Sequence, residues 1–401
     1  MNLRARILFL PSPESTIPLM RSMDVDPAGI RLMTGKSVIQ PIYLESVKSQ
    51  AANILKQEML SLGGEAAIPW DVSTFKARQS PVLLFGTPKQ YIRLVQKLKA
   101  QPFGLKGIGV MIQTLLSRIT PREISLEAGR FGLLLGKKTR VMGILNVTPD
   151  SFSDGGLFRD PARAVSRALE MVEEGAELID VGGESTRPGS KPISLQEELK
   201  RVLPVIEQLA KKLKVPLSID TTKARVAEKC IDAGASLVND TSAFQDDPKM
   251  KRVVALAKVP VILMHRLGST RTMQKDPAYK SVVSDIYAFL EQKTSEAQEA
   301  GISRDRILVD PGVGFGKTLE HNLTLLKHVS EFRSLGFPIV IGTSRKSFIG
   351  KTLGVPVEER VPGSLATLCS AVLSGTHIVR VHDVRQSVQA VRMVEAIRDA
   401  E

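Results

Sequence analysis

Cysteine and aromatic residues are scarce in this chain of 401 residues. It contains 2 cysteines, Cys230 and Cys369, which lie far apart in apolar surroundings. Two cysteines are too few for a disulfide framework or for a metal site built on thiolates. Aromatic residues make up 4% of the chain, so a core must consist mainly of Val, Leu, Ile, Ala and Met. With 43% hydrophobic and 24% charged residues, the composition is still that of a folded globular protein.

The sequence also lacks any apolar run of the roughly 18 residues that a membrane-spanning helix requires. Near the amino terminus, Arg4 and Arg6 precede only four apolar residues before Pro11, which is too short for the apolar part of a signal peptide. We therefore expect a cytoplasmic protein that does not act at a membrane.

Basic residues exceed acidic ones, and the excess is uneven. Residues 1–136 carry 17 Lys and Arg against 9 Asp and Glu, a net charge of +8, whereas residues 137–401 carry 38 against 33, a net charge of +5. Such a charge is compatible with nucleic-acid binding. However, there is no basic stripe with interleaved aromatic residues and no nucleic-acid module. We expect a solvated basic surface and anionic small substrates, and no nucleic acid as a partner.

Residues 1–124 are predicted to form a small α/β domain of unknown role. Apolar positions at helical spacing indicate a helix over 44–62. A short apolar strand is expected at 82–85, and Thr87 is expected to cap a helix over 88–100.

Residues 125–401 are predicted to form a (β/α)8 barrel, also called a TIM barrel, that begins with a hairpin over 125–136. Beyond the hairpin, eight short apolar runs alternate with helical segments over a length typical of this fold. An open doubly wound sheet is the alternative, but it usually has a glycine-rich phosphate turn after its first strand, and Asn146-Val-Thr-Pro is not one. The predicted strands are Val141–Leu145, Leu178–Val181, Leu217–Ile219, Ser236–Val238, Val261–Met264, Ile307–Val309, Ile339–Ile341 and Ile378–Val381. The predicted helices are Pro161–Glu174, Leu195–Leu213, Lys223–Ala233, Pro248–Ala257, Ala278–Ala300, His321–Val329, Gly363–Leu373 and Val384–Ala396.

Polar residues follow every one of the eight predicted strands. In a barrel the carboxyl ends of all strands meet at one rim, so we expect these side chains to converge there. A single one could simply cap the next helix, but eight in succession, with internal cations and lone carboxylates, indicate a ligand. The residues concerned are Asn146, Glu184, Ser185, Thr186, Arg187, Asp220, Asn239, Asp240, His265, Asp310, Ser344, Arg345, Lys346, Arg380, His382 and Asp383. Two loops at this rim, 146–156 and 182–190, are longer than usual and are expected to cover a substrate.

Two features suggest sites that we do not expect. The segment 310–318 superficially resembles a phosphate-binding loop, but Pro311 stands where a Walker A motif requires glycine. We interpret it as a tight turn that leaves Phe315 available for ring packing. His265 has no second histidine or carboxylate nearby in the sequence, so we expect a packed, hydrogen-bonded histidine and not a metal ligand.

Eight sequence blocks stand in a fixed order along residues 138–398. They read VMGILNVTPDSFSDGG (141–156), GGESTRPGS (182–190), SIDTTK (218–223), VNDTSAF (238–244), ILMH (262–265), DPGVGFGKTLEHNL (310–323), GTSRKSFIG (342–350) and RVHDV (380–384). Together these blocks resemble dihydropteroate synthase, a pterin-binding enzyme family of folate biosynthesis.

The resemblance implies a transferase. In this family, 6-hydroxymethyl-7,8-dihydropterin pyrophosphate condenses with 4-aminobenzoate to give 7,8-dihydropteroate and pyrophosphate, with Mg²⁺ assisting. Cleavage of the C–O bond runs ahead of attack, which gives a cation-like dihydropterin methylene, so a strong general base is not required. The family also implies a homodimer.

The resemblance assigns roles residue by residue. The pterin and the pyrophosphate would be bound by Thr186, Asp220, Asn239, Asp310, Lys346, Arg380 and His382. The aminobenzoate pocket would comprise Phe152, Arg187, Pro188, Phe315 and Ser347. Asn146 matches the position associated with the metal ion. The catalytic positions would be Asp150, Arg187, Asp220, Asp310 and Lys346.

The chain departs from the family pattern in three places. Ala243-Phe244 stands where many members have two glycines, Arg266-Leu267 stands where many have methionine-rich residues, and residues 1–136 are absent from compact members. Two rival functions remain open at this point: a methyltetrahydrofolate:corrinoid methyltransferase, and an inactive pterin-binding homologue. Lys346 and His382 argue against both, because neither function calls for a pyrophosphate pocket.

Overall fold

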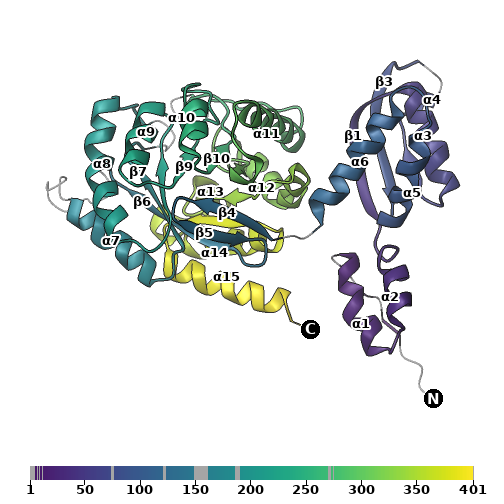
Figure 1. The fold of residues 1–401 in the computed structure, drawn as a ribbon, viewed down its shortest axis with the longest axis horizontal. Coiled ribbons are helices and arrows are strands. Elements are labelled where there is room, and N and C mark those ends of the chain that lie inside the picture. The colour runs from purple at the N-terminus through teal and green to yellow at the C-terminus, as the bar shows by residue number, and fades with distance from the viewer. Residues whose placement is uncertain are drawn as a thin grey trace. The chain divides into compact units, whose positions relative to one another are not determined.

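The computed structural model describes residues 5–6, 8, 10, 12–73, 76–120, 123–148, 161–185, 190–269, 272–273 and 275–400. The chain divides into two compact units, residues 1–120 and 121–400 (Figure 1). The division falls close to the boundary after residue 124 that we expected from the sequence. Across the described stretches, no helix is both long and apolar enough to cross a membrane.

The first unit is built on a three-stranded antiparallel sheet with the strand order β1-β3-β2. Helices α3 and α5 contribute Leu55 and Leu94 to one apolar core with Val82 and Leu84 of the central strand. The strands are β1 (Gln40–Lys48), β2 (Glu65–Ala67) and β3 (Gln79–Gly86). The helices are α1 (Ile17–Ser22), α2 (Pro27–Thr34), α3 (Ser49–Ser61), α4 (Trp70–Ser73), α5 (Pro88–Leu98) and α6 (Leu105–Ile119), with a 3-10 helix at Pro13–Thr16.

The helix predicted over 44–62 is wrong at its start. Residues up to Lys48 belong to β1, and only Ser49–Ser61 are helical. Leu44 and Val47 are buried because they face the core from the strand. A shift of register between them places both on the same face although they are three residues apart, and this spacing resembles that of a helix. The helix expected at 88–100 is confirmed as α5, whose first turn is held by a capping box between Thr87 and Gln90.

The second unit is the expected barrel. Its eight parallel strands run in the order β11-β10-β9-β8-β7-β6-β13-β12, and a further bridge between Val309 and Ile339 connects the two ends of this order. The strands are β6 (Arg140–Asn146), β7 (Leu178–Gly182), β8 (Leu217–Asp220), β9 (Leu237–Asp240), β10 (Val261–Met264), β11 (Ile307–Asp310), β12 (Val340–Ile341) and β13 (Ile378–Val381).

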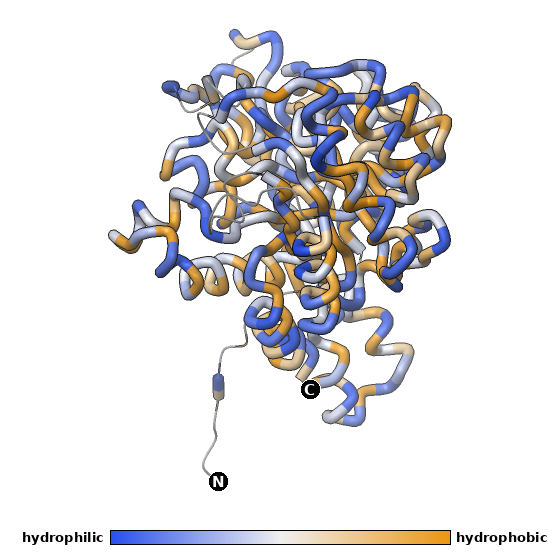
Figure 2. The backbone as a smooth tube through the Cα atoms, turned by 90° about the vertical axis from the view of Figure 1, so that its left-hand side faces the viewer, coloured by the Kyte–Doolittle hydropathy of each residue, from blue (hydrophilic) through white to orange (hydrophobic). Residues whose placement is uncertain are grey.

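Helices surround the barrel and pack their apolar faces on its outer surface. Figure 2 shows hydrophilic and hydrophobic residues alternating along these helices, as expected for amphipathic elements. The helices are α7 (Pro161–Glu173), α8 (Leu195–Lys212), α9 (Ala224–Asp232), α10 (Met250–Ala257), α11 (Val282–Glu299), α12 (Leu319–Lys327), α13 (Ser347–Leu353), α14 (Val361–Leu373) and α15 (Val384–Arg398), with 3-10 helices at Arg304–Arg306, Val329–Leu335 and Val357–Glu359. Helix α13 was not predicted, and α11 begins at Val282 instead of Ala278.

The predicted hairpin consists of β4 (Ile124–Ala128) and β5 (Phe131–Leu135), which pair antiparallel. Its buried residues Leu126 and Leu135 join an apolar cluster with the first inward-facing residues of the barrel strands, among them Met142, Leu178 and Leu237. The hairpin therefore closes the amino-terminal end of the barrel. Substrates would therefore bind at the opposite rim, where the strands end in polar residues.

Candidate functional site

The strand ends bring the predicted polar residues to one rim. Asn146, Asp220 and Asp310 are the last residues of β6, β8 and β11, and Asn239 lies next to the end of β9. Arg380 lies within β13, which is the neighbour of β6 in the barrel. The barrel thus gathers residues from across more than half of the chain into one site.

Arg380 organises the centre of this site. Its Nε donates a hydrogen bond to Asp180 Oδ2 at 2.6 Å, and its Nη2 donates to Asp220 Oδ2 at 2.7 Å. Asn239 Nδ2 donates to the same oxygen of Asp180 at 2.9 Å. One guanidinium therefore bridges strands β7, β8 and β13, and it orients the carboxylate of Asp220.

Asp180 is a site residue that the sequence prediction missed. It lies in the middle of β7, its side chain is fully buried, and its Oδ1 has no hydrogen-bond partner among the described residues. The available signal was a lone carboxylate within the apolar run Leu178–Gly182. A buried carboxylate with one unpaired oxygen is costly, so its presence indicates a functional position.

Burial shifts the proton equilibria of this network. Burial raises the pKa of Asp220 to about 7, while Arg380 opposes the rise and Asp180 adds to it. For Arg380 itself, burial lowers the pKa, but Asp180 and Asp220 together raise it above its ordinary value. The arginine therefore stays charged, whereas burial works against the negative charge of Asp220 in the free site.

Asp310 and Lys346 form the other wall of the site. Asp310 Oδ1 accepts a hydrogen bond from the backbone N–H of Gly312 at 2.7 Å, and Lys346 Nζ donates to the carbonyl oxygen of Val313. The same ammonium lies 4.3 Å from the centre of the Phe315 ring, within cation–π range. Burial lowers the pKa of Lys346 to about 7 and raises the pKa of Asp310. The two opposite charges counteract these shifts, because each favours the charged form of its partner.

His382, the residue after the end of β13, lies against Ser344. His382 Nδ1 is 3.0 Å from Ser344 Oγ, and the backbone N–H of His382 donates to the same oxygen at 3.1 Å. Arg345 is directed away from this pair, because its Nε bonds Asp383 Oδ2 at 2.9 Å. Ser347 is the exposed first residue of α13, directly after Lys346.

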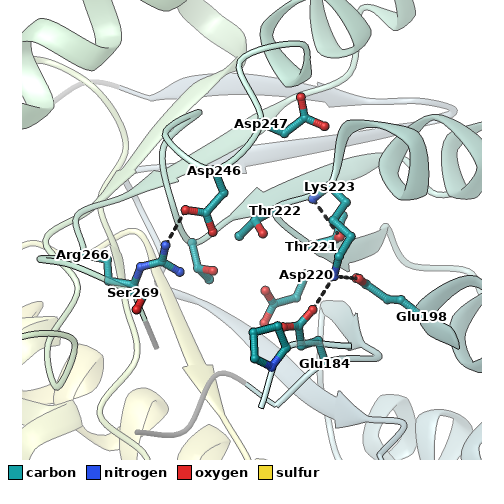
Figure 3. Close-up of a pocket in the computed structure, with 12 residues that line it drawn as sticks. Glu184, Glu198, Asp220, Thr221, Thr222, Lys223, Asp246, Asp247, Arg266 and Ser269 are labelled. Atoms are coloured by element: carbon teal, nitrogen blue, oxygen red, sulfur yellow. Dashed lines mark hydrogen bonds and ion pairs between the residues drawn. The ribbon is translucent and has the colours of Figure 1, made fainter. Parts of the chain in front are cut away.

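A cavity of about 330 Å³ opens beside Asp220 (Figure 3). On one wall, Lys223 Nζ lies between the carboxylates of Glu184 and Glu198, at 2.5 Å from Glu198 Oε2. On the facing wall, Arg266 Nη2 donates to Asp246 Oδ1 at 2.6 Å. Arg266 is one of the departures from the family pattern, and its side chain is almost wholly buried.

The second departure, Ala243-Phe244, is held in an uncommon backbone conformation. Both residues have positive φ angles, 48° and 69°, a region that favours the glycines of other family members. Asp240 holds the turn, because its two oxygens accept hydrogen bonds from the backbone N–H groups of Ser242 and Phe244, each at 2.8 Å. Asp240 therefore supports the loop and is not directed at the site.

Asn146 offers an oxygen ligand for a metal ion. A Cβ added to Gly182 would lie 3.7 Å from Asn146 Oδ1 and 3.7 Å from Asp220 Oδ2, so both oxygens border one small space that the glycine leaves free. In the described part of the chain, no group of three His, Cys, Asp or Glu side chains could hold a metal ion on its own. These residues fit Mg²⁺, which binds few protein oxygens and completes its shell with water and substrate phosphates.

Five predicted residues lie outside the described part of the chain. They are Asp150, Phe152, Thr186, Arg187 and Pro188. His265, by contrast, matches the expectation of a packed histidine: it is buried edge-on against Phe289, with ring centroids 4.8 Å apart.

Comparisons with known proteins agree with this site. A family model described as "Pterin binding enzyme" matches residues 142–382. A dihydropteroate synthase from Synechocystis is 47% identical over 263 residues, covering 65% of this chain and 91% of the relative. A probable bifunctional folylpolyglutamate synthase/dihydropteroate synthase from Halobacterium salinarum is 41% identical over 378 residues. That match covers 93% of this chain but only 45% of the relative.

A solved structure shares the fold. The dihydropteroate synthase of Xanthomonas albilineans with 4-aminobenzoic acid superposes with a TM-score of 0.66 at 41% sequence identity. The superposition covers 70% of this chain and 100% of the other. The chain therefore belongs to the pterin-binding enzymes and, among them, to the dihydropteroate synthases.

Proposed function

We propose that the chain condenses 6-hydroxymethyl-7,8-dihydropterin pyrophosphate with 4-aminobenzoate, and releases 7,8-dihydropteroate and pyrophosphate. The observation that carries this proposal is the network in which Arg380 bridges Asp180 and Asp220. It pairs a carboxylate wall for a donor-rich heterocycle with a cation for an anionic tail. A corrinoid methyltransferase needs no such cation, and an inactive scaffold has no reason to retain it.

The pterin is recognised through its amino and amide edge. Asp220, Asn239 and Asp310 present oxygens at the ends of three strands, and the N–H groups of the ring supply the donors that these buried oxygens need. Because burial raises the pKa values of Asp220 and Asp310, a ligand that donates to them is favoured over water. Lys346 donates to the opposite side of the ring.

The leaving pyrophosphate is held by positive charge. Arg380 and His382 stand at the end of β13, and Thr186 is proposed to contact the same group. Mg²⁺ bound through Asn146 would neutralise part of the phosphate charge. As the C–O bond breaks, its electron pair moves to the pyrophosphate, where fixed cations stabilise the growing charge.

The aryl amine completes the reaction. Loss of pyrophosphate leaves a cation-like methylene, which the carboxylates of the site stabilise. The lone pair of the 4-aminobenzoate nitrogen then forms the C–N bond, and the nitrogen releases one proton. Phe315 and Ser347, together with Asp150, Phe152, Arg187 and Pro188, are proposed to form the pocket for the ring and its carboxylate.

Two further properties belong to this proposal. We propose that the enzyme acts in the cytoplasm as a homodimer, in keeping with its family. Sedimentation equilibrium of the purified chain tests the assembly, and a mass of one protomer at micromolar concentration would contradict it.

A pyrophosphate-release assay tests the function. With the dihydropterin pyrophosphate and Mg²⁺ present, we expect steady pyrophosphate release only after 4-aminobenzoate is added, and equimolar 7,8-dihydropteroate by chromatography. Chelation of Mg²⁺ should suppress the rate. Absence of any aryl-amine-dependent release from folded protein would refute the proposal.

A further inference from the structure

Lys317 is a lysine whose burial the proposed reaction does not explain. Its side chain is 2% exposed. Its Nζ lies 3.0 Å from His265 Nδ1 and donates to the carbonyl oxygen of Phe315 at 2.9 Å. Burial, and after it the neighbouring Lys346, lower the pKa of Lys317 well below its ordinary value. A buried lysine costs folding free energy, which a role in holding its neighbours in place would explain.

The partner of Lys317 is a neutral imidazole. Burial, and then the charge of Lys317, lower the pKa of His265 to about 2. An uncharged ring can accept a hydrogen bond at Nδ1, which is the atom facing the lysine. The backbone N–H of His265 also donates to the carbonyl oxygen of Asp310 at 2.9 Å. His265 is therefore fixed to β11 at the point where the loop 310–318 begins.

The loop itself is bound along its length. Gly316 O accepts from the Tyr279 hydroxyl at 2.8 Å, and the Gly314 N–H donates to Asn322 Oδ1 at 2.6 Å. Gly312 has a φ of 70°, and a Cβ there would lie 1.9 Å from the carbonyl oxygen of His265. Between these fixed points, Lys317 supplies the bond to the carbonyl of Phe315. The loop can therefore present one conformation of Phe315 to the site.

Phe315 connects this anchor to the site. Its ring lies against the Lys346 ammonium at 4.3 Å, and the Lys346 side chain packs over Gly314, whose Cβ position is 2.8 Å from Lys346 Cδ. A shift of the Phe315 backbone would move the ring, whereas Lys346 Nζ would keep its hydrogen bond to the carbonyl oxygen of Val313. We propose that Lys317 is a positioning residue that fixes the backbone of Phe315 and so holds its ring in place as a wall of the proposed pocket for the aryl amine substrate. This inference rests on the proposed function, because it concerns the 4-aminobenzoate half of that site.

The alternative is that Lys317 only fills space in the barrel. The two possibilities differ in which substrate is affected. Asp220, Asn239 and Arg380 belong to strands β8, β9 and β13, and Asp310 is held separately by the backbone N–H of Gly312, so a positioning role acts mainly on the aryl amine. A general packing defect would weaken both substrates and lower the thermal stability.

The test is steady-state kinetics of the full-length chain with Lys317→Met, which keeps an unbranched side chain, one atom shorter, and removes its donors. We expect the KM for 4-aminobenzoate to rise about tenfold or more, because small displacements of positioning groups cost rate and affinity steeply. The KM for the dihydropterin pyrophosphate should stay within about threefold, since its main contacts are untouched. Lys251→Met, a partly buried lysine on α10 paired with Glu296, is the matched control and should leave both constants unchanged.

A second variant separates donation from charge. Lys317→Gln retains an N–H donor without the charge, and should recover part of the aminobenzoate KM. Unchanged constants in a folded Lys317→Met enzyme, or equal increases for both substrates, would overturn the inference. If the methionine variant does not fold, the glutamine variant must show the selective increase for the inference to stand. Inactivity of the wild-type chain would instead count against the proposed function.

Discussion

The two units of this protein bury different kinds of side chains. Among the described residues, the first unit buries the hydroxyl-bearing side chains of Thr16, Ser49, Ser80 and Tyr91, and no Asp, Glu, Lys, Arg or His side chain. The barrel buries a set of ionisable side chains, which includes Asp180, Glu198, Asp220, Asp240, His265, Arg266, Asp310 and Lys317. Buried charges cost free energy and persist where binding or catalysis uses them. The comparison assigns the chemistry to the barrel and leaves an ordinary apolar core to the first unit.

The relatives divide along the same line. The Synechocystis match covers 91% of that protein but 65% of this chain, so its length corresponds to the barrel without the first unit. The Halobacterium match covers 93% of this chain and thus extends into the first unit. The barrel is therefore large enough to account for the Synechocystis match, whereas the Halobacterium match also includes residues of the first unit.

The removal of a charged side chain from the barrel rim should have the strongest effect on the reaction. Asp310→Ala or Lys346→Ala should lower kcat/KM about a thousandfold or more, because each removes a charged group placed against the pterin. Asp310→Asn is the shape-preserving variant and should lose nearly as much. Trp70→Ala, which truncates an 82% exposed side chain of the first unit, is the control and should leave the kinetics unchanged. Near-normal turnover of the Asp310 variants would remove the pterin assignment.

The arginine bridge offers the next largest effect. Arg380→Ala leaves Asp180 and Asp220 buried without their cation, and breaking a buried pair in this way costs about 3–5 kcal/mol of unfolding free energy. It should also weaken inhibition by the product pyrophosphate more than it raises the KM for 4-aminobenzoate. Denaturant unfolding and product-inhibition kinetics measure the two effects.

A surface ion pair is the control for Arg380. The exposed pair of Arg225 and Glu228 on α9 should change stability by less than about 1 kcal/mol when either partner is replaced by alanine. Equal losses for pyrophosphate and aminobenzoate in Arg380→Ala would contradict the anion-pocket role.

The site residues at the strand ends could be predicted, because in a parallel barrel the residues at the carboxyl end of every strand lie at the same rim. Asn146, Asp220 and Asp310 each end an apolar run, and each ends a strand. Asp180 could not be found by the same rule, since it lies within a run and not after it. Strands of a parallel barrel are buried on both faces, so the alternation that would reveal an inward-facing carboxylate is hidden. Leu178 of the same strand faces the barrel interior, two residues away, as the period of a strand requires.

The partners of buried polar groups were also beyond prediction. The sequence shows that Lys317 follows a glycine-rich turn, but nothing in it indicates that the Nζ of this lysine meets His265 from another strand. Likewise, Glu198 lies on an amphipathic helix, where a charged residue is expected to face water, yet it is 1% exposed. Such contacts depend on tertiary packing between segments far apart in the chain, which local patterns do not encode.

Glu198 allows a finer test of how the barrel tunes its charges. Burial raises the pKa of Asp220 to about 7. Arg380 opposes this rise, and the negative charges of Asp180 and Glu198 add to it. If the free enzyme needs Asp220 ionised, the acid limb of kcat/KM against pH lies near this value, and activity falls as the pH drops through it. Glu198→Gln removes a negative charge, so the acid limb should move to lower pH, by about half a unit.

Glu184, which contacts Lys223 as Glu198 does, provides the control. Glu184→Gln removes the other carboxylate that contacts Lys223. Because the charge of Glu184 is not among those with the largest effect on Asp220, this variant should shift the acid limb less than Glu198→Gln does, even if it alters the rate. Equal shifts in both variants would mean that the lysine contact, and not the charge beside Asp220, sets the limb.

The smallest expected effect comes from removing the first unit altogether. A chain of residues 121–401 keeps both strands of the hairpin, including β4 from Ile124, which closes the amino-terminal end of the barrel. Because the buried charges lie in the barrel and each unit has a separate apolar core, kcat/KM should stay within about threefold of the full chain. Circular dichroism melting should show one cooperative transition. A shortened chain that folds but does not turn over would show that the first unit takes part in catalysis, and the division between a catalytic barrel and an added unit would then be wrong.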